Sequence, residues 1–271
     1  MGKSTYRKVE RNNLKIVLLG SGNVATYLAK HFDTVADVTQ IWSRNPIHSS
    51  QLASELQNAV AVEDIQEIER DADFYIISVT DDAIEEVAAK LPEVKGIVAH
   101  TSGSFPLTKL LNIVKHSKCG VIYPLQTFSK NSRAEIKEIP FLIEGDTGET
   151  TAKLTTLARL ASENVLTVGS AMRADLHLAA VFANNFTNYI LDLSNRYLRE
   201  NTQFNIRVLK PLLIETVNKV MNIDPYNAQT GPAVRNDKEV IKTHLSKLSP
   251  ELQDVYKYLT DKIIKDHQKD E

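Results

Sequence analysis

The sequence has a single cysteine, no long apolar run and almost no excess of either charge. Cys119 has no partner for an internal disulfide, so we expect a reducing, cytoplasmic location. No stretch approaches the length of a membrane span, and the polar N-terminal tail, residues 1–13, lacks the apolar centre of a signal peptide. The net charge of −2 argues against nucleic-acid and acidic-membrane partners, which favour a basic face.

Common catalytic and metal-binding motifs are missing as well. The chain contains no C-x-x-C, no H-E-x-x-H and no Ser–His–Asp spacing, and its 7 histidines are scattered, so we expect no metal site. The composition, 42% hydrophobic and 24% charged, is typical of a soluble globular protein, and 271 residues are enough for two domains.

The clearest motif is an apolar run followed by a glycine turn. Residues 14–19 have the length of a strand buried on both faces, and GSGNVA at 20–25 fits G-x-G-x-x-A before an amphipathic helix. Glycines in this pattern allow the tight turn and the approach of a pyrophosphate to the helix N-terminus. The alternative is a strand–turn–helix unit that binds no nucleotide. The predicted cofactor-binding residues here are Gly20, Ser21, Gly22, Asn23 and Val24.

The end of the second expected strand, residues 35–42, indicates which dinucleotide is bound. An NAD site usually has an acidic residue here, which accepts hydrogen bonds from the adenosine ribose. Ser43 and Arg44 stand at these positions, and an arginine pairs with a 2′-phosphate. We therefore expect NADP(H) as the cofactor, the alternative being a solvated arginine in a turn.

Two further strand ends carry hydroxyl groups. Apolar strands are expected at 73–79 and 96–99, followed by Thr80 and by HTSGS at 100–104. Open parallel sheets bind ligands at the carboxyl ends of their strands, so these residues are expected near the nicotinamide. Helix capping is the alternative role for the hydroxyls. The predicted residues are Val79, Thr80, Thr101 and Ser102 for the cofactor, and Ser102 and Gly103 for the substrate.

The pattern along the chain predicts two domains. Strands and helices alternate up to residue 168, which indicates an α/β, doubly wound dinucleotide-binding domain over residues 14–168. Strand patterns then vanish, and residues 169–271 read as an all-helical domain for substrate binding and dimerisation, with helices at about 174–198, 206–221, 237–246 and 250–266.

The long helix has a polar stripe. His177, Val181, Asn184 and Asn188 are spaced i, i+4, i+7 and i+11, which places them on one face of an α-helix. A histidine and two amides are unusual in a core because buried amides need partners. We predict that His177 and Asn184 are catalytic and that Asn188 binds substrate, the alternative being polar contacts between helices or at a dimer interface.

A second polar cluster, TGPAVRND at 230–237, precedes a helix. Arg235 beside a helix N-terminus is a candidate for binding a substrate carboxylate or phosphate. The alternative is a loop between helices in which Asp237 caps the following helix.

The motifs GSGNVA, HTSGS, YPLQTFS, HLAAVFANNFTN and TGPAVRND resemble a bacterial family. In this family a Rossmann-like domain precedes a domain of unknown function, DUF2520, and its members are labelled NADP oxidoreductases of the F420-dependent type. The wider clan contains pyrroline-5-carboxylate reductase, 3-hydroxyisobutyrate dehydrogenase and 6-phosphogluconate dehydrogenase. The resemblance implies a helical, often dimer-forming second domain with substrate held between the domains.

One departure from the clan concerns catalysis. Its hydroxyacid dehydrogenases carry a catalytic lysine four residues before an asparagine; if Asn185 matches that asparagine, Val181 replaces the lysine. His177, one turn earlier, is the substitute candidate. We expect a homodimeric NADP(H)-dependent oxidoreductase acting on a small molecule in the cleft between domains. The alternative is a non-catalytic NADP-binding sensor or scaffold.

Overall fold

The computed structural model describes residues 13–129 and 136–268. It divides into two compact units, Met1–Asn184 and Asn185–Glu271. The expected polar tail lies, apart from Asn13, outside the described residues. By contacts, the first unit continues sixteen residues beyond the predicted end of the dinucleotide-binding domain at 168 and includes the helix that follows.

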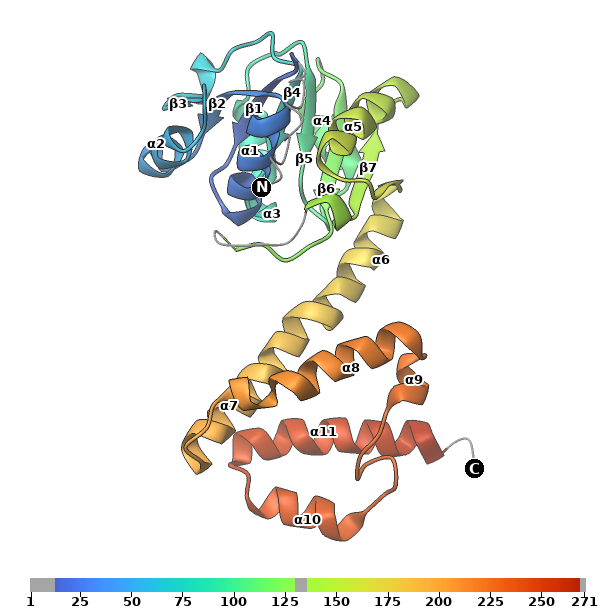
Figure 1. Cartoon of the computed structure of the whole chain (residues 1–271). Helices are drawn as coiled ribbons and strands as arrows, with labels where there is room; N and C mark the ends of the chain where they lie inside the picture. The colour runs from blue at the N-terminus through green and yellow to red at the C-terminus, as the bar shows by residue number, and fades with distance from the viewer. Residues whose placement is uncertain (1–12, 130–135, 269–271) are drawn as a thin grey trace, which may run out of the picture. The chain divides into compact units, whose positions relative to one another are not determined.

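The first unit is built on an eight-stranded sheet with the order β3-β2-β1-β4-β5-β6-β7-β8 (Figure 1). All neighbouring strands are parallel except β6 and β7, which pair antiparallel. The strands are β1 (Lys15–Leu19), β2 (Asp37–Trp42), β3 (Val60–Val62), β4 (Phe74–Ile77), β5 (Ile97–His100), β6 (Cys119–Pro124), β7 (Phe141–Gly145) and β8 (Val165–Thr167). The expected doubly wound α/β fold is confirmed, and each expected strand is present.

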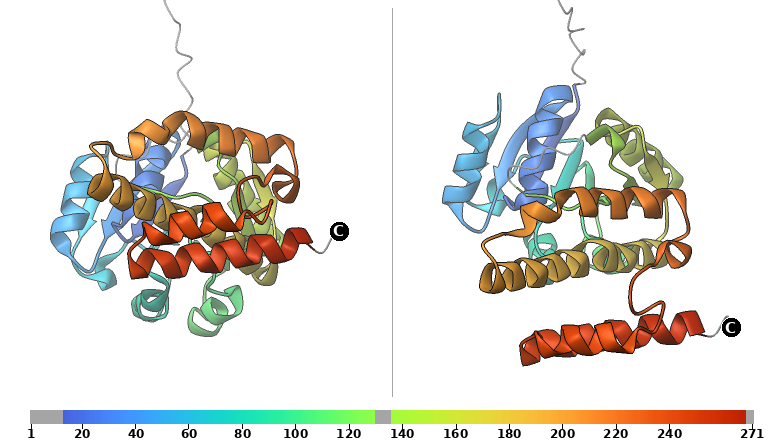
Figure 2. Two further views of the ribbon diagram at one scale, coloured as in Figure 1. Left: turned by 90° about the horizontal axis from the view of Figure 1, so that it is seen from below. Right: turned by 60° about the horizontal axis from the view of Figure 1, so that its bottom comes forward.

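Helices cover both faces of this sheet. The helices of the unit are α1 (Asn23–Val35), α2 (Pro46–Ser54), α3 (Asp81–Lys90), α4 (Leu107–Ile113), α5 (Gly148–Ala161) and α6 (Ser170–Ala180), with short 3-10 turns at Ile65–Glu67 and Ile136–Glu138. In the left view of Figure 2, α3 and α4 lie side by side on the face away from α1 and α5. The order of the strands reverses between β1 and β4, because β2 and β3 lie on one side of this point and β4 and β5 on the other. A doubly wound sheet binds its ligand at such a point.

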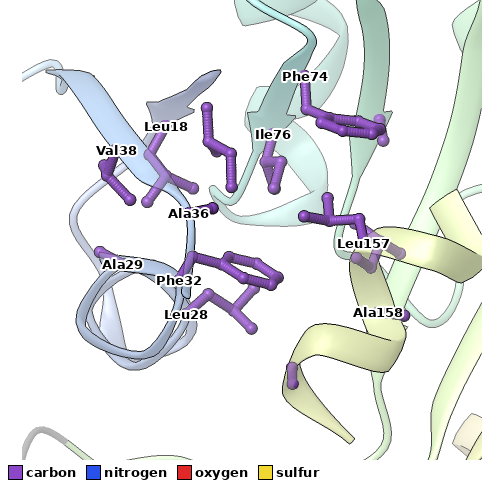
Figure 3. Packing of buried hydrophobic residues seen from close by; sticks show 14 of the residues in the cluster. Leu18, Leu28, Ala29, Phe32, Ala36, Val38, Phe74, Ile76, Leu157 and Ala158 are labelled. Atoms are coloured by element: carbon purple, nitrogen blue, oxygen red, sulfur yellow. The ribbon is translucent and has the colours of Figure 1, made fainter. Parts of the chain in front are cut away.

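The two faces have separate apolar cores. Leu28 and Phe32 of α1 and Leu157 of α5 point toward the strands that carry Leu18 and Ile76, as Figure 3 shows. All five side chains are fully buried. The opposite face packs α3 and α4 on β4, β5 and β6. Because both faces are covered, the central strands are apolar along their whole length, which is why their pattern is readable in the sequence.

The second unit is helical. It contains α7 (Thr187–Asn201), a 3-10 turn at Ile206–Leu209, α8 (Lys210–Asn222), α9 (Pro225–Ala228), α10 (Lys238–Ser246) and α11 (Pro250–His267). Polar side chains join its segments: the Asn195 carbonyl accepts from the Ile206 amide at 3.0 Å, and Gln253 donates to the carbonyl oxygens of Leu245 and Leu248. None of the helices within the described ranges is both long and apolar enough to traverse a bilayer.

The long helix expected at 174–198 differs from a regular α-helix. Between α6 and α7, residues Val181–Phe186 form a π-helical turn, and the unit boundary lies within it. A π turn accommodates one additional residue, which rotates everything beyond it by about 100° relative to an α-helical stripe. Asn184 and Asn188 therefore do not continue the face of His177, and both are exposed. The prediction that these residues share one face of a regular α-helix is wrong for this reason, and the roles proposed for them stay predictions.

Candidate active site

The glycine turn after β1 leaves open space at the N-terminus of α1. Gly20 has φ +131°, and a Cβ there would lie 2.1 Å from the Ser78 carbonyl oxygen, so both its conformation and its packing require glycine. At Gly22, the N-cap of α1, a Cβ would meet no protein atom within 4 Å. No side chain caps this helix, and its first turn has no acidic residue. Free amides beside open space are the features that bind a pyrophosphate.

The end of β2 lies beside this turn. The Ser21 and Ser43 hydroxyl groups are 2.8 Å apart, which joins the glycine turn to the residue before Arg44. Arg44, Asn45 and His48 are exposed around the N-terminus of α2. None of these three residues is acidic, although the Arg44 charge helps to lower the pKa of Glu86 after the larger effect of Lys90. The guanidinium suits a phosphate on the adenosine ribose.

The segment after β5 forms a tight turn held by its own side chains. The Ser102 hydroxyl accepts from the amides of Ser104 and Phe105, at 3.1 and 2.9 Å, so it acts as a local cap. Thr101 donates to the Ser78 hydroxyl at 3.1 Å, which links this turn to the end of β4. Neither hydroxyl caps the helix that follows: α4 has Pro106 at its N-cap and no side-chain cap, Ser102 holds the turn itself, and Ser104 donates to the Asp81 carboxylate.

His100 at the end of β5 is a structural residue. It is fully buried, and its Nδ1 accepts from the Ser102 amide at 3.1 Å. Burial, together with the nearby Arg173 charge, lowers the pKa of His100 to about 3. The ring is therefore neutral at physiological pH and supports the turn rather than exchanging protons.

His177 lies directly on this turn. A Cβ on Gly103 would be 2.6 Å from both Cγ and Nδ1 of His177, so the glycine makes room for the ring. The Nδ1 atom is 2.9 Å from the Tyr123 hydroxyl, and the two rings meet edge to face with centroids 5.8 Å apart. Tyr123 is at the carboxyl end of β6 and is half-buried, like His177.

A buried ion pair fixes the start of the helix that carries His177. Arg173, fully buried, pairs with the Glu144 carboxylate of β7 and donates to the Phe105 carbonyl oxygen at 2.7 Å. The same carboxylate accepts from the amide and the hydroxyl of Ser170, at 3.0 and 2.7 Å. The first turn of α6 is thereby joined to β7 and to the turn after β5, which positions His177 two helical turns from Ser170.

These segments surround one cavity of about 520 Å³. Glycine-turn residues, the end of β2, and the ends of β4 to β6 contribute to its lining, as does α6. The lining residues are Gly20, Ser21, Gly22, Asn23, Val24, Ser43, Arg44, Asn45, His48, Ser78, Val79, Thr80, Asp81, Thr101, Ser102, Gly103, Tyr123 and His177. The structure thus brings together every predicted cofactor-binding residue, along with Gly103 and His177; their binding roles stay predictions.

The other three predicted site residues are not in this cavity. Asn184 is exposed in the π-helical turn, and Asn188 and Arg235 belong to the second unit. Arg235 is exposed in a turn before α10, where the Asp237 carboxylate accepts from the Val240 amide at 3.2 Å. The capping role proposed as the alternative for Asp237 is therefore present.

Several lining residues were not predicted. Tyr123 lies near the carboxyl end of β6, so the rule that placed Thr80 and Ser102 at the carboxyl edge also applies to it. Asn45 and His48 follow Arg44 by one and four residues. Glu144 and Arg173 carried no such signal, because their pairing joins segments 29 residues apart. Within the described ranges, no group of three or more metal-binding side chains is present.

Two family models match the chain. Residues 15–101 match the model described as NADP oxidoreductase coenzyme F420-dependent, and residues 139–263 match a domain of unknown function, DUF2520. Glycerol-3-phosphate dehydrogenase [NAD(P)+] of Legionella pneumophila (strain Corby) is 29% identical over 138 residues. That match spans 46% of this chain and 42% of the relative, less than half the length of either protein.

Solved structures extend the similarity to nearly the whole chain. A Bacteroides fragilis protein, provisionally named NADP oxidoreductase BF3122, has 37% identity and a TM-score of 0.87, covering 93% of this chain and 98% of that one. A reductive aminase from Aspergillus terreus, solved with NADPH and ethyl levulinate, shares the fold at 14% identity, with a TM-score of 0.67 and coverage of 94% and 95%. The chain therefore belongs to the NADP oxidoreductases in which an F420-dependent-type NADP-binding domain is followed by DUF2520, and its cofactor is NADP(H).

Proposed function

We propose that this protein transfers a hydride between NADP(H) and a small molecule with a C=O, C=N or flavin-like acceptor, and that His177 provides the proton. The observation that carries the proposal is that His177 and the glycine turn line the same cavity. NADPH, when bound, supplies the hydride. The protein contributes binding, orientation and proton delivery.

Cofactor binding is assigned to the glycine turn and to the ends of β2, β4 and β5. The open space at Gly22 and the free amides of α1 support a pyrophosphate there. Arg44 is proposed to pair with the 2′-phosphate, since no acidic residue stands where an NAD site would have one. Val79, Thr80, Thr101 and Ser102 then surround the nicotinamide half, where the ends of β4 and β5 meet.

Proton delivery is assigned to His177 because of its position and its chemistry. Hydride addition leaves negative charge on the heteroatom of the substrate, and a proton or hydrogen bond stabilises it as it forms. Nδ1 of His177 is engaged by Tyr123, and among the described residues no partner is recorded for Nε2. Nε2 is the atom proposed to reach the substrate.

The names of related proteins agree with this reaction class. A reductive aminase was solved with NADPH and a keto ester, and a glycerol-3-phosphate dehydrogenase uses NAD(P)+. Asn184, Asn188 and Arg235 stay candidate catalytic and substrate-binding residues, since amides and a guanidinium suit a polar substrate.

The partner and location follow from composition. We propose a homodimer formed through the helical unit, in the cytoplasm, with no nucleic-acid or membrane partner. The near-neutral charge and the lone, buried Cys119 support this assignment.

The test compares turnover with cofactor affinity. NADPH oxidation is followed with a panel of keto acids, aldehydes, imines and deazaflavins. His177→Ala is expected to lower kcat by 10²–10⁴-fold, roughly the contribution of a general acid, and to leave NADPH affinity nearly unchanged because the pyrophosphate and the 2′-phosphate are assigned to other residues. Affinity is measured by isothermal titration calorimetry.

His116→Ala is the matched control, because His116 is exposed in the connection between α4 and β6 and does not line the cavity. It should leave both turnover and affinity unchanged. A variant at His177 that unfolds more easily but keeps its rate per folded molecule would show a structural role. NADPH binding without turnover of any acceptor would favour the sensor instead.

A further inference from the structure

The strongest unassigned feature of the cavity is the contact between Tyr123 and His177. Their side chains come from β6 and α6, 54 residues apart, and meet at 2.9 Å between Oη and Nδ1. Gly103 lies against the same edge of the ring, since a Cβ there would be 2.6 Å from both Nδ1 and Cγ. The Nδ1 edge of the imidazole is thus packed against Gly103 and Tyr123, and Nε2 lies on the opposite edge.

The direction of this hydrogen bond follows from the chemistry of the two groups. A neutral imidazole nitrogen is a better acceptor than a phenol oxygen, and the phenol O–H is the better donor. Burial, and after it the Asp81 carboxylate, raises the pKa of Tyr123, against a smaller opposing effect of Arg173. Tyr123 therefore keeps its proton at neutral pH and donates it to Nδ1.

We propose that Tyr123 is the positioning residue that holds neutral His177 as the Nε2–H tautomer and replaces the proton that His177 gives to a carbonyl substrate. This inference rests on the proposed function, because it takes His177 as the proton donor. It adds the substrate class: the atom that receives the proton is an oxygen that becomes an alkoxide.

The proton balance distinguishes a carbonyl from an iminium ion, whose nitrogen is neutral after hydride addition and needs no proton. When hydride adds to a carbonyl carbon, the C=O π electrons move to oxygen, which takes the proton from Nε2. Nδ1 gains the Tyr123 hydroxyl proton, which leaves a neutral ring of the other tautomer and a phenolate. Nε2 then takes a proton from water as Nδ1 returns its proton to the phenolate, and the starting state is restored. An alkoxide is a much stronger base than a phenolate, so the transfer is downhill despite the raised pKa of Tyr123.

The tautomer can be observed without turnover. Long-range ¹H–¹⁵N NMR of the ¹⁵N-labelled full-length protein distinguishes a protonated ring nitrogen from an unprotonated one, and the His177 signals are assigned by their loss in His177→Ala. We expect Nε2–H in the wild type, both without ligand and with NADP⁺. In Tyr123→Phe, which keeps the ring and removes the hydroxyl, we expect a mixture of tautomers and unchanged NADP⁺ affinity.

The chain contains a matched control pair. In the helical unit the Tyr256 hydroxyl is 2.8 Å from Nδ1 of His244, with centroids again 5.8 Å apart, in an exposed setting. Tyr256→Phe should alter the His244 signals and leave those of His177 unchanged.

Turnover gives the second readout. With an aldehyde or keto acid that the wild type reduces, Tyr123→Phe should lower kcat at least 10-fold with little change in KM, whereas reduction of a preformed iminium should be little affected. A wild-type His177 with its proton on Nδ1, or a Tyr123→Phe spectrum like that of the wild type, would overturn the proposal. Loss of turnover only in His177→Ala would instead leave the proposed function intact and remove the role of Tyr123.

Discussion

At the scale of single residues, the cavity combines positions that must be glycine with positions that carry charge or protons. Gly20 and Gly103 are required by neighbouring atoms, one by the Ser78 carbonyl oxygen and the other by the His177 ring. Gly22 has no such neighbour, so the protein itself does not require a glycine there. Its open space is best explained by a ligand that approaches the backbone.

Arg44 is predicted to decide between the two nicotinamide cofactors. Its guanidinium can make a charge-assisted contact with a 2′-phosphate worth roughly 1.5–3 kcal/mol. Arg44→Glu should therefore remove most of the preference for NADPH over NADH, a change of about 10- to 150-fold in the ratio of dissociation constants. Fluorescence titration with both cofactors measures this ratio.

A charge reversal far from the cavity separates this effect from general electrostatics. Arg159 is exposed on α5, so Arg159→Glu makes the same change in net charge without touching the cofactor site. It should leave the preference intact. Equal affinity of the wild type for NADPH and NADH would contradict the assignment of Arg44.

At the scale of elements, α6 is placed by a buried network at its first turn. The Glu144 carboxylate of β7 pairs with Arg173 and accepts hydrogen bonds from the amide and the hydroxyl of Ser170. The Ser170 hydroxyl in turn accepts from the Leu107 amide at the start of α4. The carboxylate thus joins β7 to α6 directly and to α4 through Ser170. Because the side chain of His177 is carried by α6, this network sets where the imidazole meets Tyr123.

Breaking that network should be costly. Arg173→Met keeps the length of the side chain and removes its charge, which leaves the Glu144 carboxylate without its cation. Removing one partner of a buried ion pair typically lowers the free energy of unfolding by about 3–5 kcal/mol. Urea denaturation followed by circular dichroism measures the loss.

Lys90→Met is the corresponding change at an exposed pair. Lys90 contacts Glu86 four residues earlier on α3, in a setting where ion pairs contribute little. The urea concentration at which half of the Lys90→Met variant is unfolded should stay close to that of the wild type. If both variants unfold at the same urea concentration, the buried network does not stabilise the fold as described.

At the scale of the whole molecule, the helical unit exposes many large apolar side chains. At Met221 the exposed fraction is 76%, and at Tyr258 it is 63%. Monomeric proteins rarely leave so much apolar surface to water. Others on this unit, each at least 37% exposed, are Phe186, Tyr189, Ile190, Phe204, Val208, Leu212, Ile214, Val217, Ile223, Tyr226, Val240 and Leu259.

We therefore expect a homodimer that buries this surface. Sedimentation equilibrium at micromolar concentration should give twice the chain mass of 30.3 kDa, since an isologous contact between such faces removes apolar area from water in both copies. Adding NADPH should not dissociate it. A single species at the monomer mass would rule the homodimer out.

The sequence by itself determined the elements of the first unit and most of its candidate site. Strands such as β1 and β4 are buried on both faces, so their apolar runs are local signals, and parallel pairing brings their carboxyl ends to one edge. That is why the sequence alone predicts Gly20, Thr80 and Ser102 around one cavity. The sequence also predicted the cofactor, because the residues that indicate NADP(H), Ser43 and Arg44, directly follow β2 in the chain.

Only the tertiary structure decided which distant side chains meet. Tyr123 and His177 meet because the start of α6 is bound to Glu144 of β7, and no spacing in the sequence encodes a contact between a strand end and a helix 54 residues later. The π-helical turn after α6 likewise removed Asn184 and Asn188 from the face of His177, since a helical stripe assumes a constant turn per residue. Local periodicity specifies elements, whereas their contacts depend on how the buried surfaces of separate elements fit together.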